Sequence, residues 1–197
     1  MDIPEAITDL RNLKINKDKR VWRPFMEKYD CQTVCEIGVF AGRNFFGLIQ
    51  HKPQLAVAID AWINDGITSH NDAGLSQVAL DKEYMNFVAR MADKPFVKIY
   101  REFSSDAVKH FPDEYFDLVY VDGDHTYEGS LNDIENWFPK VKKGKFLIGD
   151  DYTRTVDPPN LVYDVKRAVN DYSKKNNLTA YEIPGNQWAT GWAIIKP

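Results

Sequence analysis

The sequence predicts an α/β protein whose doubly wound, mostly parallel seven-stranded sheet ends in an antiparallel hairpin. Apolar runs of strand length alternate with amphipathic helical patterns along most of the chain, which is typical of parallel sheets covered by helices on both faces. Two of these runs, within residues 116–121 and 145–149, stop abruptly at acidic side chains. Open sheets of this kind bind ligands at the carboxyl ends of their strands. We therefore expect the functional site where these two strands end.

Length and composition indicate one soluble domain over residues 1–197, with an N-terminal helical extension over residues 1–30. The net charge of −4 gives no electrostatic reason to expect a nucleic acid as partner. No apolar run approaches the roughly 20 residues that span a bilayer, and the polar start is not typical of a signal peptide. Cys31 and Cys35 lack a second Cys/His pair, which favours buried reduced thiols in a cytoplasmic protein over a zinc site.

The N-terminal extension has apolar residues spaced three and four apart, which predicts two amphipathic helices. The residues of the first helix and then of the second are Ile3, Ile7, Leu10 and Leu13, and Trp22, Phe25 and Tyr29. We expect these helices to cover the sheet or to form the surface of a homo-oligomer.

Five parallel strands are predicted over residues 33–37, 55–59, 96–100, 116–121 and 145–149. A helical pattern follows each of them. The first helix is expected to end near Gln50, and the second to include Tyr84 to Met91. The third begins at Ser104 or Ser105 as N-cap and ends at His110. The last two are expected from Tyr127 to near Pro139 and from Leu161 to Tyr172. Residues 181–183 and 188–195 complete the sheet as the closing hairpin.

Residues 62–80 form an irregular stretch rich in Asn, Asp and Gly after the second strand. A segment of this length beside a strand end favours a functional lid over a disordered spacer.

The first strand runs into the sequence Glu36-Ile-Gly38-Val-Phe-Ala-Gly42. Its glycines permit a tight turn and a close approach of ligand to backbone at a helix start. Glu36 stands where a dinucleotide-binding motif has its first glycine, and an acid there suits a cationic or hydroxyl-bearing ligand better than a pyrophosphate. By itself the motif also fits a purely structural turn.

Asp60 ends the second strand, some twenty residues further along the chain. An acid at this place can accept hydrogen bonds from both hydroxyls of a ribose. The alternative is a solvated turn aspartate.

The two acidic strand ends carry Asp122 and the pair Asp150 and Asp151. Neighbouring strands lie roughly 5 Å apart, so these carboxylates should converge and require a cation or shifted pKa values. Oxygen ligands suit Mg²⁺ first, with Ca²⁺ or Mn²⁺ behind it. His125, three residues after Asp122, could act as a base near neutral pH.

Each of these residues also has a structural interpretation. Asp124 is better explained as the N-cap of the following helix than as a ligand. His125 could be a solvated loop histidine, and Asp151 could be satisfied by backbone amides of its own loop.

These motifs, the segment Ser104-Ser-Asp106 and the final hairpin resemble the Rossmann-like class I S-adenosylmethionine-dependent methyltransferases over about residues 30–197. The segments 121–128 and 149–152 resemble one metal-dependent branch of them. That branch includes macrolide sugar O-methyltransferases of the macrocin and mycinamicin type and the cephalosporin-hydroxylase-like proteins.

The resemblance implies a role for each matching residue. Those expected to bind S-adenosylmethionine are Glu36, Gly38 and Gly42 at the methionine end, Asp60 at the ribose, and Ser104, Ser105 and Asp106 near the adenine. Magnesium would be bound by Asp122, Asp150 and Asp151, with catalysis assigned to His125 as general base and to Asp122. Asp150 departs from the pattern, because the acidic pair in those enzymes often begins with Glu.

The function expected is therefore O-methylation of a small hydroxylated molecule, of which a sugar is one example, without a nucleic-acid or membrane partner. Three alternatives remain at this point. They are a metal-independent methyltransferase acting on nitrogen, a nicotinamide oxidoreductase, which Glu36 disfavours, and a cofactor-binding module of the same fold without turnover.

Overall fold

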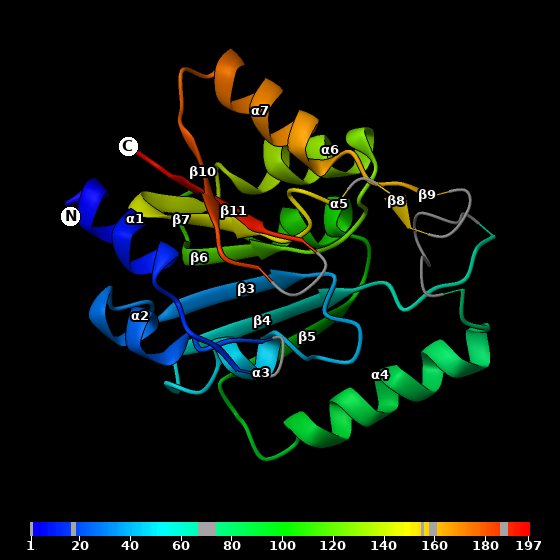
Figure 1. Ribbon diagram of the computed structural model, residues 1–197. Coiled ribbons are helices and arrows are strands. Elements are labelled where there is room, and N and C mark those ends of the chain that lie inside the picture. The colour runs from blue at the N-terminus through cyan, green and yellow to red at the C-terminus, as the bar shows by residue number, and fades with distance from the viewer. Residues whose placement is uncertain (1, 17–18, 67–73, 155, 158–160, 186–188) are drawn as a thin grey trace.

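The computed structural model describes residues 2–16, 19–66, 74–154, 156–157, 161–185 and 189–197. One central sheet lies between two layers of helices (Figure 1). Residues of α1, α2, α3 and α4 belong to the apolar cluster on one face of the sheet. Residues of α6 and α7 belong to the cluster on the other face.

The sheet has seven strands in the order β10-β11-β7-β6-β3-β4-β5. Their bounds are Thr33–Ile37 (β3), Leu55–Asp60 (β4), Val97–Arg101 (β5), Phe116–Val121 (β6), Val141–Gly149 (β7), Ala180–Ile183 (β10) and Gly191–Ile195 (β11). The strands from β3 to β7 are parallel to one another, whereas β11 runs antiparallel to both β7 and β10. The predicted doubly wound sheet with a closing hairpin is confirmed. Since β3 pairs with β4 on one side and β6 on the other, the connections diverge there, and this is where such sheets bind ligands.

The helices are Ile3–Arg11 (α1), Arg23–Lys28 (α2), Phe45–Leu48 (α3), Gln77–Met91 (α4), Ser104–Ala107 (α5) with a 3-10 turn over Val108–His110, Tyr127–Trp137 (α6) and Val165–Lys175 (α7). Two short hairpins join Ile15–Asn16 (β1) to Lys19–Arg20 (β2) and Val156–Asp157 (β8) to Leu161–Val162 (β9). Leu161 thus lies in a strand and not in the last helix, which starts later than predicted. The predicted lid over residues 62–80 is partly helical from Gln77, and residues 67–73 of it lie outside the described residues.

Two predicted helix caps are wrong. Phe103 is the N-cap residue of α5, and Ser104 instead donates a hydrogen bond to Asp133 through its hydroxyl. Thr126, not Asp124, caps α6 by accepting the N–H of Gly129 at 3.1 Å. The Asp124 carboxylate accepts the N–H of Thr126 at 2.9 Å, because a short acidic side chain readily closes a turn with the backbone two residues on.

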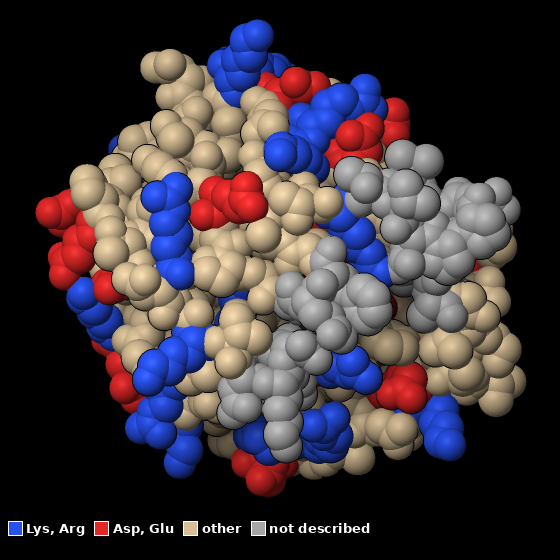
Figure 2. Space-filling view, in the orientation of Figure 1, with Lys and Arg blue, Asp and Glu red and all other residues tan. Residues whose placement is uncertain are grey.

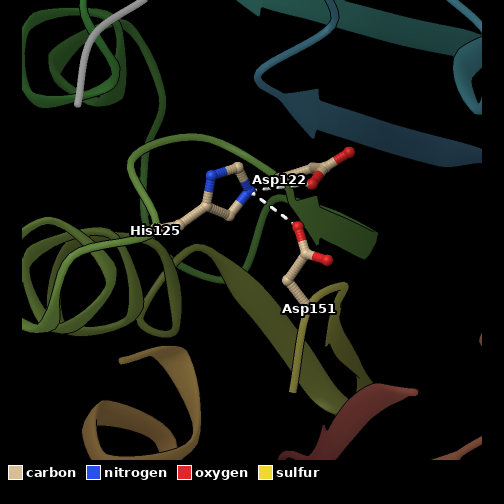
Figure 3. A group of neighbouring side chains, drawn as sticks. All are labelled: Asp122, His125 and Asp151. Atoms are coloured by element: carbon tan, nitrogen blue, oxygen red, sulfur yellow. Dashed lines mark hydrogen bonds and ion pairs between the residues drawn. The ribbon is translucent and has the colours of Figure 1, made fainter. Parts of the chain in front are cut away.

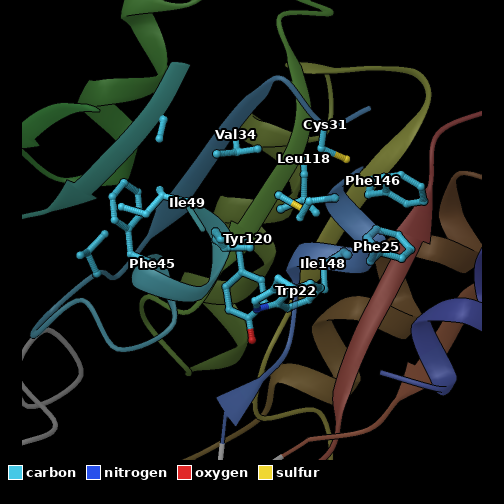
Figure 4. Close-up of a cluster of buried hydrophobic side chains, with 14 of the residues drawn as sticks. Trp22, Phe25, Cys31, Val34, Phe45, Ile49, Leu118, Tyr120, Phe146 and Ile148 are labelled. Carbon is cyan, nitrogen blue, oxygen red and sulfur yellow. The ribbon is translucent and has the colours of Figure 1, made fainter. Parts of the chain in front are cut away.

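The N-terminal helices are part of the core. Ala6, Ile7 and Leu10 of α1 are buried in the same cluster as Trp22 and Phe25. Figure 4 shows Trp22 beside Tyr120 of the sheet, and the two rings meet edge to face with centroids 5.7 Å apart. The expectation that these helices cover the sheet is confirmed, and a homo-oligomer through them stays a prediction.

No helix in the described part of the chain has both the length and the apolar character to cross a bilayer. On the face in Figure 2, described basic and acidic side chains are interspersed and do not gather by sign.

Candidate active site

A cavity of about 680 Å³ opens at the carboxyl ends of β3, β4, β6 and β7. Each of these strands contributes to its wall, through Gly38, Asp60, Asp122 and Asp150 respectively. Its volume is in the range of small-molecule and cofactor pockets, and its position is the one expected for an open parallel sheet.

Gly38 joins the turn after β3 to the turn after β6. Its φ is +80°, and its N–H donates to the carbonyl of Ile59 at 2.9 Å. A Cβ atom added here would overlap the backbone carbonyl of Asp122. Only glycine allows the two turns to pack this closely, so Gly38 sets the position from which Asp122 enters the cavity.

Gly42 has a different part in the same turn. Its φ is +75°, and an added Cβ would lie 2.6 Å from the ring of Phe87 in α4. Gly42 does not line the cavity. It therefore shapes the turn from behind, and its predicted contact with the cofactor stays a prediction.

Glu36 lies within β3 behind the cavity wall and is only 1% exposed. Burial, reinforced by the nearby charge of Asp122, raises the pKa of Glu36 well above its usual range. Its Oε2 accepts a hydrogen bond from Asn44 at 3.3 Å, and Asn44 in turn accepts the indole N–H of Trp22 at 2.7 Å. Its predicted role at the methionine end of the cofactor stays a prediction.

Asp60 holds two turns at the edge of the cavity. Its two carboxylate oxygens accept the backbone N–H groups of Phe40 and Trp62, both at 2.7 Å. Both of those residues have left-handed φ values, +46° and +42°, a conformation that costs non-glycine residues energy and that the Asp60 bonds offset. A carboxylate has about four acceptor sites, so Asp60 can still accept ribose hydroxyls.

Only two of the three residues predicted to lie near the adenine, Ser104, Ser105 and Asp106, line the cavity. Ser104 and Ser105 line the cavity, whereas Asp106 is exposed and pairs with Lys109 at 2.7 Å. Ser104 donates to Asp133, a cavity residue in α6 that the sequence reading missed. The available signal was its position directly before the buried Ile134 on the inner side of that helix.

Asp133 predicts a specific pH dependence of stability. It is 3% exposed, and burial raises its pKa from 3.8 to about 7. In the unfolded chain the carboxyl loses its proton near pH 4, but in the folded protein it does so near pH 7. Stability is therefore lost as the pH rises between these values, by about 2 kcal/mol between pH 5 and pH 8. Urea unfolding at the two pH values should show at least this loss in the wild type. Asp133→Asn should reduce the total loss by about this amount, because Glu36 and Asp151, whose pKa values are also raised, keep their own contributions. An unchanged pH dependence in the variant would contradict the assignment.

His125 stands between two of the predicted metal ligands. Its Nε2 lies 3.3 Å from Asp122 Oδ1 and 3.1 Å from Asp151 Oδ2. Figure 3 shows this ring nitrogen pointing at both carboxylates. The potential ligand atoms of the three residues all lie within 4.8 Å of one another. His125 is thus not a solvated loop histidine, since its side chain is only 12% exposed.

The segment before α7 holds the imidazole ring of His125 in place. Tyr163 stacks on it with ring centroids 4.7 Å apart, and the N–H of Asp164 donates to the His125 carbonyl at 2.9 Å. The guanidinium of Arg154 lies 4.4 Å from the centroid of the Tyr163 ring. Arg154 comes from a loop without a readable pattern, and Tyr163 lies in a segment that was predicted to be the start of the last helix. The sequence therefore carried no signal for either contact.

Asp151 has the features of a ligand. It is 5% exposed with a left-handed φ of +56°, and burial raises its pKa to about 6, against the lowering effect of His125. Its Oδ1 accepts no hydrogen bond from any residue that the structure describes, although Arg154 Nη1 lies 3.5 Å away. This orphaned oxygen argues against satisfaction by backbone amides. A hard cation would satisfy it, so Asp122 and Asp151 fit such an ion.

Asp150 also lines the cavity but lies outside that group. Its Oδ1 pairs with Nη2 of Arg20 at 3.1 Å, and its Oδ2 accepts from Nη1 at 3.4 Å. The structure therefore brings together two of the three predicted carboxylates, and the ligand role of Asp150 stays a prediction. Arg20 was missed because it is 130 residues away in the chain.

The sequence and the fold both resemble those of known methyltransferases. A family model described as a methyltransferase domain matches residues 35–152. A curated relative, the uncharacterized protein R132 of Acanthamoeba polyphaga mimivirus, is 33% identical over 55 residues. That alignment covers 28% of this chain and 25% of the relative's length.

Among solved structures, the O-methyltransferase NovP aligns with a TM-score of 0.63 and 19% identity, over 98% of this chain and 80% of its own. The O-methyltransferase TomG from Streptomyces achromogenes, solved with SAM, aligns with a TM-score of 0.63 and 15% identity, over 98% of this chain and 90% of its own. A putative caffeoyl-CoA O-methyltransferase from Staphylococcus aureus aligns with a TM-score of 0.64 and 12% identity, over 98% of this chain and 91% of its own. At these identities the likeness concerns the fold.

Proposed function

Because this chain belongs to the methyltransferase-domain family, we propose that it transfers the methyl group of S-adenosylmethionine to a hydroxyl of a small molecule, with a divalent cation beside His125. One observation carries the proposal. His125 Nε2 lies within 3.3 Å of Asp122 and Asp151, in the same cavity as Gly38 and Asp60. A base, two carboxylates and a nucleoside-type subsite thus share one space. A sugar is among the acceptors included, and a cytoplasmic location is supported by the two buried free thiols, Cys31 and Cys35.

The cofactor would occupy the part of the cavity formed after β3, β4 and β5. Asp60 is placed to accept hydrogen bonds from the ribose hydroxyls, and Gly38 leaves the backbone open to close approach. Ser104 and Ser105 are expected near the adenine. The likeness of the fold to that of TomG, which was solved with SAM, supports SAM as the cofactor.

The cation would be bound by the carboxylates of Asp122 and Asp151, which lie together beside His125. All-oxygen ligands favour Mg²⁺, followed by Mn²⁺ or Ca²⁺. When bound, such an ion acts as a Lewis acid that lowers the pKa of a hydroxyl group.

His125 would take the proton of the acceptor hydroxyl on Nε2. The acceptor oxygen then forms its bond to the methyl carbon while the carbon–sulfur bond breaks, which leaves S-adenosylhomocysteine and a protonated His125. Stacking on Tyr163 and the backbone bond from Asp164 hold the imidazole in place for this step. Alignment of the two substrates in one cavity supplies much of the acceleration.

The test has two parts with separate consequences. Titration calorimetry with S-adenosylhomocysteine should show binding to the pure protein, and its absence would contradict the whole proposal. Methyl transfer should then stop in excess chelator and return with added Mg²⁺, because the acceptor proton is harder to remove without the cation. Full activity in chelator would contradict the cation alone. Identification of an N-methylated product would favour the metal-independent alternative.

A further inference from the structure

Arg20 brings a permanent positive charge under the acidic end of the cavity. Its side chain is only 4% exposed, and a guanidinium stays charged at any physiological pH. Nη1 donates to the hydroxyl of Tyr120 at 2.6 Å, and Nε donates to the carbonyl of Pro184 at 2.7 Å. Arg20 lies in β2, outside the matched methyltransferase domain of residues 35–152. The segment before that domain therefore reaches the site.

The guanidinium has little freedom to move. Its carbon lies 5.8 Å from the ring centroid of Trp22 and 5.9 Å from that of Tyr120. Figure 4 shows the Tyr120 hydroxyl directed out of the apolar cluster, which is where Arg20 meets it. A Cβ atom on Gly191 of β11 would overlap Nη2. Strands β2, β6 and β11 thus enclose the group.

Asp150 and Asp151 are consecutive, yet their side chains meet different partners. Both oxygens of Asp150 face Arg20, at 3.1 and 3.4 Å, and a two-point charged pair of this kind holds a carboxylate strongly. The left-handed backbone of Asp151 turns its carboxylate to His125 instead, at 3.1 Å.

We propose that Arg20 is a positioning residue that withholds Asp150 from the cation, so that the docked N-terminal segment limits the ligand carboxylates to Asp122 and Asp151. The inference rests on the proposed cation site. Its physical basis is twofold, since Arg20 holds the third carboxylate in a fixed direction and its own charge repels a dication.

Manganese binding tests the proposal without reference to turnover. Electron paramagnetic resonance of free Mn²⁺ reports its affinity for the wild type, Arg20→Met, Asp150→Asn and the double variant. Arg20→Met should bind Mn²⁺ about tenfold more tightly, because it loses one positive charge and frees Asp150. The double variant should stay within about twofold of the wild type, since it loses one charge of each sign. Asp150→Asn should weaken Mn²⁺ binding by clearly less than tenfold, because it leaves the Arg20 charge unpaired but removes no ligand.

Two further variants serve as controls. Arg20→Lys keeps the charge beside Asp150 and should bind Mn²⁺ within about threefold of the wild type. Arg20→Lys also replaces Arg20→Met if the half-buried, unpaired Asp150 prevents that variant from folding. Tenfold tighter Mn²⁺ binding by Arg20→Lys would then contradict the role given to the charge. Arg23→Met removes a nearby exposed arginine paired with Glu27 and should change nothing.

The contrary results are distinct. Unchanged or weaker Mn²⁺ binding by Arg20→Met would overturn the proposal, as would a tenfold loss in Asp150→Asn, which would make Asp150 a ligand already in the wild type. No binding by wild type and Arg20→Met alike would overturn it too. Calorimetry with S-adenosylhomocysteine on the same samples tells whether the proposed methyltransferase function fails with it.

Discussion

Gly38→Ala is expected to destabilise the protein by about 4 kcal/mol or more. The added Cβ would overlap the carbonyl of Asp122, and backbone on both sides leaves no flexible side chain to give way. The left-handed φ of +80° adds strain of its own. Any relaxation must separate the turn after β3 from the turn after β6, so the variant should also lose binding of S-adenosylhomocysteine.

Urea unfolding measures this loss, and Gly144→Ala is the matched control. Gly144 also has a left-handed φ, +72°, but an added Cβ would meet nothing within 4 Å. It should cost about 1 kcal/mol from backbone strain alone. Equal losses in the two variants would show that strain, and not the close approach of the two turns, explains the glycine at position 38.

His125→Gln is expected to lower kcat by about 10²- to 10⁴-fold, the usual contribution of a general base. Glutamine keeps a polar side chain near Asp122 and Asp151 but cannot take a proton near neutral pH. Binding of S-adenosylhomocysteine should change by less than about twofold, because His125 acts on the acceptor and not on the cofactor.

Steady-state kinetics and calorimetry separate these two effects. His51→Gln is the control, since His51 Nε2 contacts the carbonyl of Cys31 at 2.6 Å and lies outside the cavity lining. A His125→Gln enzyme with normal kcat would contradict the role of His125 as base. A normal kcat with weaker binding of S-adenosylhomocysteine would instead indicate that His125 contacts the cofactor.

The sheet was predictable because its signals are local. The strand over residues 33–37 was predicted with the observed bounds, and the hairpin was recognised from its turn residues and alternating pattern. Helix starts were less predictable. Ser104 has the character of a cap, but the buried Asp133 competes for its hydroxyl, and no local pattern indicates that partner.

The proximity of Asp122 and Asp151 was predictable because it also follows from local signals, namely the positions where two neighbouring strands end. Parallel strands end at one edge of a sheet, so the ends of β6 and β7 had to bring Asp122 and Asp151 near each other. Proximity of His125 follows from its place three residues after Asp122. The stacking of Tyr163 on that histidine depends on how a segment distant in the chain returns to the site, which no local pattern indicates.

The sequence by itself thus determined the fold class, the edge of the sheet that carries the site and the residue types gathered there, because strand periodicity and residues at strand ends are local properties. Only the tertiary structure decided which acids have shifted pKa values and which group each one faces. Burial raises the pKa of Glu36, and Arg20 of the N-terminal segment pairs with Asp150 but not with Asp151. Ionisation and ion pairing depend on neighbours from every part of the chain and on the exclusion of water, which no short pattern encodes.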